Sequence, residues 1–223
     1  MGRAVAAEAI GSAFLLAAVV GSGIMGELLS GGNVAIALLA NAIATGGALY
    51  ALIVLFGPIS GAHFNPVVTI ALAMRGMVER ERVMPYIAAQ VVGAILGVWL
   101  AHLMFELPIL EVSTKVRWGI GPWAGEITAT FGLVLLIGIA ARRTAEPALP
   151  AAVACYIVGA YWFTSSTSFA NPAVTIARSL SNTFAGIAPA GAPAFIVCQL
   201  VGAALALGVM HFLDSRKTPD PNG

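Results

Sequence analysis

The chain has 223 residues, of which 59% are hydrophobic and only 9% are charged. Soluble domains carry about 25% charged residues, so this composition indicates a membrane protein. The net charge of +1, with no long basic or acidic run, gives no indication of a nucleic-acid partner. Cys155 and Cys198 stand alone in apolar segments and predict neither a disulfide framework nor a zinc site.

Six apolar stretches are long enough to cross a bilayer, since a spanning helix needs about 20 mostly apolar residues. In chain order they lie at 5–26, 34–56, 84–105, 120–141, 148–168 and 193–213. The first follows Arg3, as the apolar core of a secretory signal follows a basic residue. Its length and the five stretches after it favour a spanning helix. The sequence therefore predicts an all-α membrane protein.

Two further segments, 65–76 and 171–182, are predicted to be helical but are too short to span. Each begins with Asn-Pro, and proline suits the first turn of a helix because its missing N–H would lack an intrahelical partner there. Both are therefore predicted to be half-helices that enter the bilayer. Their apolar sequences and matching starts disfavour the alternative, a pair of amphipathic connectors on the membrane surface.

Positive charges predict the orientation, because cytoplasmic loops are enriched in Lys and Arg. A six-span topology places eight such residues on one side, namely Arg3, Arg75, Arg80, Arg82, Arg142, Arg143, Arg216 and Lys217. Three fall on the other side, namely Lys115, Arg117 and Arg178. This asymmetry predicts a multi-pass protein of the cell (inner or plasma) membrane with both termini in the cytoplasm.

The chain, predicted to be one transmembrane domain over 1–223, contains two related halves, approximately 1–110 and 118–215. AEAIGSAFLLAAVV in the first half resembles GEITATFGLVLLIG in the second, and AAQVVGAILG resembles VCQLVGAALA. These matches align Glu8 with Glu126 and Gln90 with Gln199. Each half has three spans, an odd number, so the second half is predicted to be inverted relative to the first.

Half-helices that enter from opposite sides point their N-termini at each other near the midplane. Each N-terminus carries about half a positive charge and unpaired N–H groups. Asn65 and Asn171 can cap these ends through their side-chain oxygens while their amide groups donate to a passing molecule. Irregular backbone at membrane depth must be buried in protein or line a watery cavity. The pattern predicts a narrow pore that disfavours cations and favours neutral hydrogen-bonding molecules.

Two carboxylates within the spans need a role, because a charge in a membrane is costly. One hypothesis is that Glu8 and Glu126 accept hydrogen bonds from the re-entrant loops and hold them in place, with the matched Gln90 and Gln199 in the same supporting role. The alternative is that each carboxylate lies at the membrane interface. His63, two residues before Asn65, either lines the cytoplasmic mouth or anchors the loop.

These features resemble the major intrinsic proteins, the family of aquaporins and glycerol facilitators, over essentially the whole chain. The resemblance is carried by AEAIGSAFLL, SGAHFNPVVT, QVVGA, GEITATFGLVL and ANPAVT. It identifies the two pore motifs as Asn65-Pro66-Val67 and Asn171-Pro172-Ala173, with Val67 where a small residue is usual. It implies a homotetramer in the lipid membrane with one pore for small uncharged solutes in each subunit.

The resemblance also implies four positions for the selectivity filter, namely Thr45, Gly159, Ser168 and Val174. Water-selective members usually have an aromatic residue at the first, histidine at the second and arginine at the last. This filter is therefore expected to be wide, neutral and weakly polar. The pattern is similar to that of bacterial aquaglyceroporins associated with arsenic resistance, which implies arsenite as a neutral trihydroxide, glycerol and water as solutes.

Arg178 follows Val174 by about one turn, on the same helical face as Asn171. It either biases the outer vestibule from a position about 6 Å further out or contacts lipid headgroups at the interface. An ion-coupled secondary transporter of a small polar solute is the main alternative function, since inverted repeats and broken helices occur there too. No cluster of His, Asp and Glu has the spacing of an enzyme or metal site, so neither an enzyme, a metal site nor a cofactor is predicted.

Overall fold

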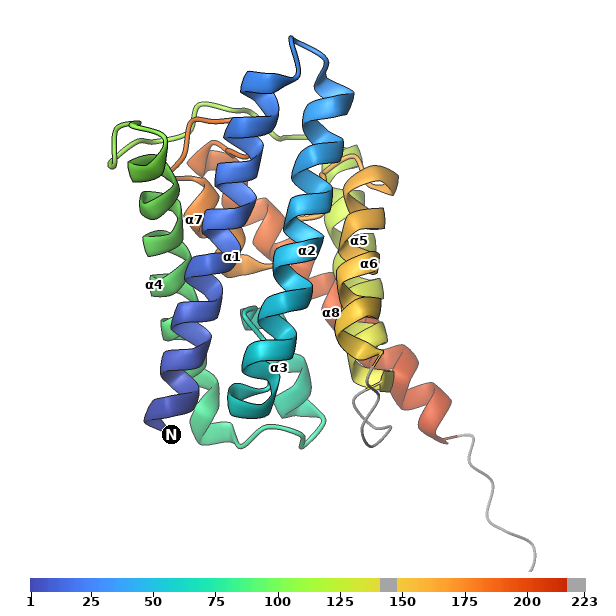
Figure 1. Cartoon of the computed structure of the whole chain (residues 1–223). Coiled ribbons are helices and arrows are strands. Elements are labelled where there is room, and N and C mark those ends of the chain that lie inside the picture. Colours follow the sequence, from blue (N-terminus) through green and yellow to red (C-terminus); the bar gives the residue numbers. More distant parts are fainter. Residues whose placement is uncertain (141–147, 216–223) are drawn as a thin grey trace, which may run out of the picture.

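The computed structural model describes residues 1–140 and 148–215, and every regular element in that part of the chain is helical (Figure 1). Six longer helices are α1 (Gly2–Leu29), α2 (Val34–Ser60), α4 (Arg80–Met104), α5 (Ile120–Ala140), α6 (Leu149–Phe163) and α8 (Ala192–Ser215). Two short helices, α3 (Pro66–Met74) and α7 (Pro172–Arg178), lie between them, and a 3-10 turn, Pro189–Gly191, precedes α8. The predicted fold of six spans and two half-helices is confirmed.

Residues at the two ends of helix α2 fix where it begins and where the chain turns toward the first half-helix. Its N-terminus is capped by Asn33, whose side-chain oxygen accepts hydrogen bonds from the N–H groups of Ala35 and Ile36. Its C-terminus is Gly61, with φ of 89°, a left-handed conformation that glycine adopts without steric cost. The chain then turns back into the protein instead of continuing out of the bilayer, and α3 begins five residues after Gly61.

Helix α6 is shorter than the predicted span 148–168, because it ends at Phe163. Its 15 residues correspond to about 22 Å at a rise of 1.5 Å per residue, whereas the other five long helices have the length to cross a bilayer. The helix ends where Thr164 becomes extended and its Oγ1 donates to the Ala160 carbonyl. The residues up to Asn171 then form the second re-entrant loop.

Helix α7 ends at Arg178, four residues before the predicted end of its half-helix. The Arg178 carbonyl accepts a hydrogen bond from the N–H of Ile187, and the Ser179 carbonyl accepts one from the N–H of Ser113. These carbonyls are therefore already occupied by neighbouring segments. A continued helix would need them for its own N–H groups, so the chain leaves the helix at this point.

The longer helices pack in two groups that correspond to the predicted halves. Helix α1 lies against α2 and α4, α5 lies against α6 and α8, and α2 contacts α6 across the halves. Where α1 meets α4, a Cβ atom on Gly93 or Gly97 would lie 2.1 Å from the carbonyl oxygens of Ala9 and Ala13. Small residues bring these backbones together, as is usual for helices packed in lipid. The boundaries 1–110 and 118–215 stay a prediction.

The surface and the interior have the polarity expected of a protein in a bilayer. Large apolar side chains such as Phe14, Leu96 and Trp162 are exposed, whereas Glu8 and Glu126 are fully buried. The N-terminus lies at the same end of the bundle as α3 and the α3–α4 connection (Figure 1). Of the predicted cytoplasmic cations, Arg142, Arg143, Arg216 and Lys217 lie outside the described residues. Which end faces the cytoplasm stays a prediction.

Candidate functional site

The first residue of each pore motif caps a half-helix. The side-chain Oδ1 of Asn65 accepts a hydrogen bond from the N–H of Val67 at 3.0 Å. The Oδ1 of Asn171 accepts from the N–H groups of Ala173 and Val174 at 2.9 and 3.2 Å. Proline follows the cap in both, where no intrahelical N–H is needed. The sequence Asn-Pro thus accounts for both helix starts.

The two half-helices are joined by their asparagine side chains. Asn65 Nδ2 donates to the carbonyl of Ala170 at 2.7 Å, and Asn171 Nδ2 donates to the carbonyl of Phe64 at 2.8 Å. One of the two amide N–H bonds of each asparagine therefore goes to the opposite loop. The expectation that the whole amide group of each asparagine would donate to a solute is therefore corrected. An amide nitrogen carries two hydrogens, so one N–H bond per asparagine is left for the solute.

The residues before each asparagine have left-handed backbone, with φ of 48° at Phe64 and 47° at Ala170. For residues other than glycine this conformation costs about 1–2 kcal/mol. Each of these peptides makes hydrogen bonds through both of its polar groups, because its N–H donates to a buried carboxylate and its carbonyl accepts from an asparagine. These bonds offset the strain and fix the loops.

Glu8 holds the first loop from behind. Its Oε1 accepts from Ser60 Oγ at 2.6 Å and from the N–H of His63 at 3.0 Å. Its Oε2 accepts from the N–H of Phe64 and from Gln90 Nε2, both at 2.7 Å. A buried carboxylate with four donors is well satisfied. Since its exposure is 0%, the interfacial alternative does not apply to Glu8.

Glu126 holds the second loop in the same way. Its two oxygens accept from the N–H groups of Phe169 and Ala170 at 2.8 and 2.9 Å. Gln199 Nε2 donates to it at 2.6 Å. Glu126 is also 0% exposed, so it does not lie at the interface either. The structure therefore places the two carboxylates and the two glutamines behind the half-helices, in equivalent positions.

Two threonines that sequence reasoning missed complete these networks. Gln90 Nε2 donates to Thr69 Oγ1 at 2.9 Å, and Gln199 Nε2 donates to Thr175 Oγ1 at 2.8 Å. Each threonine hydroxyl in turn donates to the carbonyl of its own capping asparagine. The signal was present in the sequence, because both motifs have threonine at the fourth position after asparagine.

His63 combines the two roles that its position left open. It lines the cavity between the two halves. Its Nδ1 lies 3.0 Å from Thr69 Oγ1, and its ring meets the edge of Tyr86 with centroids 5.5 Å apart. His63 therefore contributes to the wall of the mouth and is also fixed to the loop.

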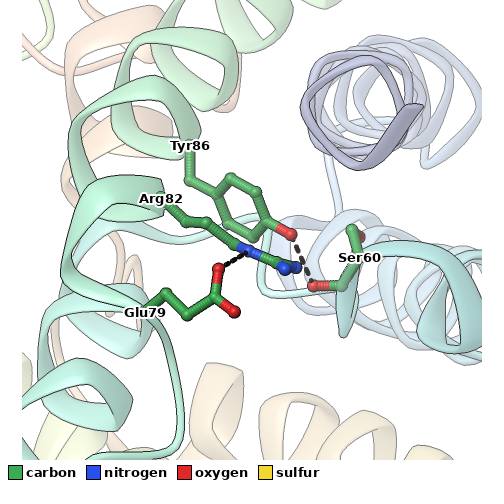
Figure 2. Close-up of polar contacts among 4 residues, drawn as sticks. All are labelled: Ser60, Glu79, Arg82 and Tyr86. Atoms are coloured by element: carbon green, nitrogen blue, oxygen red, sulfur yellow. Dashed lines mark hydrogen bonds and ion pairs between the residues drawn. The ribbon is translucent and has the colours of Figure 1, made fainter. Parts of the chain in front are cut away.

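Helix α4 ties down the start of the same loop. Figure 2 shows the Tyr86 hydroxyl donating to the backbone carbonyl of Ser60, at 3.0 Å. One turn earlier on the helix, Arg82 forms an ion pair with Glu79 at 2.7 Å. Because Ser60 Oγ donates to Glu8, the loop is held both at its backbone and through its side chain.

A cavity of about 830 Å³, a volume that includes adjoining open solvent, lies between the two halves. Most of its wall is aliphatic, with residues such as Leu15, Val68 and Ile137. Its polar side chains are Thr45, His63, Asn65, Tyr161, Ser168, Asn171 and Arg178. Both capping asparagines thus reach the cavity, where their second N–H bonds can contact a solute.

The predicted filter residues are only partly brought together. Thr45, Ser168 and Val174 lie on the cavity wall, but Gly159 does not. A Cβ atom on Gly159 would meet only the Phe163 ring of its own helix, at 3.8 Å. Tyr161, two residues further along α6, does line the cavity. The other motif residues, Pro66, Val67, Pro172 and Ala173, are buried and are not among the residues that line the cavity.

Arg178 is on the cavity wall and is only 2% exposed, so it is not a lipid-headgroup arginine. Its Nε donates to the carbonyl of Ala185. Its guanidinium carbon lies 3.4 Å from the centroid of the Phe169 ring, within the range of a cation–π contact. The charge one turn beyond Val174 is therefore fixed in place at this end of the cavity.

Two further cations lie beside Arg178. Arg117 stands 5.2 Å from the Phe169 centroid and donates through Nε to the carbonyl of Gly186 at 2.8 Å. Lys115 Nζ donates to the carbonyl of Phe184 at 2.9 Å. Burial lowers the pKa of Lys115, and the neighbouring Arg117 lowers it further. This end of the cavity is electropositive, which disfavours the approach of cations.

Comparison with known proteins agrees with this architecture. The sequence profile described as "Major intrinsic protein" matches residues 1–165. Aquaglyceroporin AqpS of Rhizobium meliloti is 52% identical over 213 residues, covering 95% of this chain and 90% of the relative. The probable aquaporin AqpM of Archaeoglobus fulgidus is 33% identical over 183 residues, covering 74% of this chain and 72% of the relative.

The fold itself matches a solved structure, the aquaglyceroporin from Plasmodium falciparum. The TM-score is 0.72 at 18% identity, and the match covers 96% of this chain and 99% of that one. Together with the profile match, these similarities show that the chain is a multi-pass membrane protein and not an enzyme. The chain belongs to the major intrinsic protein family, whose members are channels for small solutes.

Proposed function

We propose that the protein is a passive channel for small neutral solutes, among them arsenite as its trihydroxide, glycerol and water. The observation that supports this proposal is a cavity that carries both asparagine amides on its wall and an aliphatic residue, Val174, three positions after Asn171. A neutral hydroxylated solute replaces its lost hydrogen bonds to water with these donors. A cation instead meets the positive N-terminal ends of two half-helices.

Ser168 adds a polar group for such a solute. Its side chain lies on the wall, and its Oγ has no hydrogen-bond partner within residues 1–140 and 148–215. A buried hydroxyl without a partner gains most from a solute that supplies one. Glycerol and arsenite both carry hydroxyl groups that donate and accept. Relatives named as an aquaglyceroporin and a glycerol uptake facilitator give further support for this class of solute.

The absence of arginine at Val174 supports a solute range wider than water. A guanidinium at that position would project from the wall into the cavity beside Asn171, whereas valine adds neither a charge nor hydrogen-bond donors. Arg178 supplies a cation on the cavity wall from one turn further out. In this proposal it biases the outer vestibule against cations without occupying the filter. The protein is further proposed to be a homotetramer of the cell (inner or plasma) membrane, with both termini in the cytoplasm.

The proposal is tested with purified protein in liposomes, by stopped-flow measurement of the permeabilities to water, glycerol, urea and arsenite. Fast flux of all four relative to protein-free liposomes is expected, and flux of water alone would contradict the wide filter. Collapsing proton and sodium gradients with ionophores should leave uptake unchanged. Uptake that stops with the gradient would instead support an ion-coupled transporter.

A further inference from the structure

Tyr161 occupies the wall of the cavity at the level of the predicted filter. It is 3% exposed and lines the cavity together with Thr45 and Ser168. Its hydroxyl lies 3.4 Å from Thr45 Oγ1. We propose that Tyr161, paired with Thr45, is the residue that limits the size of the solutes this channel admits. The inference rests on the proposed channel function.

The phase of helix α6 carries the argument. Residues of α6 at intervals of four lie on the cavity wall, namely Leu149, Val153, Ile157 and Tyr161. The opposite stripe holds the exposed Cys155 and Phe163, and Gly159 falls between these two positions. Two residues correspond to about 200° of rotation in an α-helix. Gly159 and Tyr161 therefore point to opposite sides, and only Tyr161 can contact a passing solute.

A phenol ring changes what this end of the cavity accepts. Glycine at this place would leave the wall without a side chain, whereas the Tyr161 ring forms part of the wall. The Tyr161 hydroxyl donates to Thr45 Oγ1 at 3.4 Å, which is longer than the usual 2.7–2.8 Å of an O–H···O hydrogen bond, so this weak bond can be exchanged for one to a solute. The wall thus offers a flat apolar face and several hydroxyls, including that of Ser168. Short linear polyols match this combination.

The test uses liposomes with a series of neutral polyols of increasing length, namely glycerol, erythritol and xylitol. Tyr161→Ala should raise the ratio of erythritol to glycerol permeability by about tenfold, the discrimination that one methylene-sized change of fit gives. Tyr161→Phe keeps the ring and should leave this ratio close to that of the wild type. Gly159→Leu is the matched control on the same helix and should change no permeability, because position 159 does not face the cavity.

Each outcome is decisive. An unchanged ratio in folded Tyr161→Ala, or loss of glycerol flux in folded Gly159→Leu, would overturn the inference. Should Tyr161→Ala fail to fold, Tyr161→Leu takes its place, because it removes the ring but keeps the site filled with an aliphatic side chain such as those at Val153 and Ile157 on the same face. An unchanged ratio of erythritol to glycerol permeability in folded Tyr161→Leu would also contradict the inference. Size-exclusion profiles and melting temperatures monitor folding. Wild-type protein that conducts none of the polyols and no water would instead refute the proposed channel function.

Discussion

Replacing Glu126 with glutamine tests whether an ionised carboxylate holds the second re-entrant loop. The substitution keeps the shape of the side chain but turns one oxygen into a donor. In the better amide orientation, glutamine still accepts from Ala170 and Gln199, but its new N–H₂ faces the N–H of Phe169. In the other orientation, two donors lose their acceptor.

The cost follows from these contacts. A buried donor without a partner costs about 1–3 kcal/mol, and the surviving bonds lose their charge assistance, so we expect a total of about 2–5 kcal/mol. Relief from burying a charge reduces this figure but does not replace the missing acceptor. Since each kcal/mol shifts Tm by about 2–4 °C in a chain of this length, the melting temperature should fall by about 10 °C.

The assay is thermal unfolding of the detergent-solubilised protein, followed by intrinsic tryptophan fluorescence, with permeability measured on the same preparation. Glu81→Gln is the control, because Glu81 is an exposed carboxylate of α4 and its replacement should change Tm very little. Glu8→Gln should behave like Glu126→Gln, since Glu8 accepts four hydrogen bonds. An unchanged melting temperature with loss of only the pH-dependent part of transport would refute the loop-holding role and favour a proton relay.

Four further substitutions have directional outcomes. Val174→Arg should place a guanidinium in the filter and reduce glycerol flux by about tenfold while water still passes. Arg178→Ala should raise the leak of cations, because Arg178 is proposed to bias the vestibule against them, and an unchanged leak would leave Arg178 a structural role only. Gly93→Ala should destabilise the protein by about 1–3 kcal/mol, because its Cβ would lie 2.1 Å from a carbonyl oxygen of α1, whereas Gly208→Ala, with nothing within 4 Å, should not. Asn171→Asp should admit cations, measured as proton leak into liposomes with a pH-sensitive dye, since a carboxylate at the midplane opposes the two helix dipoles.

Much of the fold could be predicted, because a bilayer imposes length and polarity on the sequence. Apolar runs located the spans to within a few residues, and Asn-Pro located the starts of both half-helices. The alignment of the two halves also pairs Glu8 with Glu126 from the sequence alone. Each of these features could be predicted from a short stretch of sequence. A buried charge or an unpaired backbone N–H is costly in any membrane protein, so the residues that avoid this cost form recognisable local patterns.

The ends of the half-helices and the links between the loops could not be predicted in this way. Helix α7 stops at Arg178, where the N–H of Ile187 binds the Arg178 carbonyl and the N–H of Ser113, from the connection after α4, binds the next carbonyl, that of Ser179. The bond from Asn171 to the Phe64 carbonyl likewise joins residues in different halves. Contacts of this kind depend on tertiary packing, and neither hydropathy nor spacing within one segment carries a signal for them.

The filter position on α6 shows a more general reason for error. Counting 12 residues back from Asn171 to Gly159 passes through residues 164–170, which are not helical and carry no fixed rotation per residue. The helix has its own phase, and the apolar positions Leu149, Val153 and Ile157 already mark a stripe that continues to Tyr161. A position in a helical wall is therefore better assigned from the period of that helix than from its distance to a motif across a loop. Applied to this chain, that rule places Tyr161 rather than Gly159 on the cavity wall. Under the proposed size limit at Tyr161, the solute range then depends on α6 as well as on the half-helices.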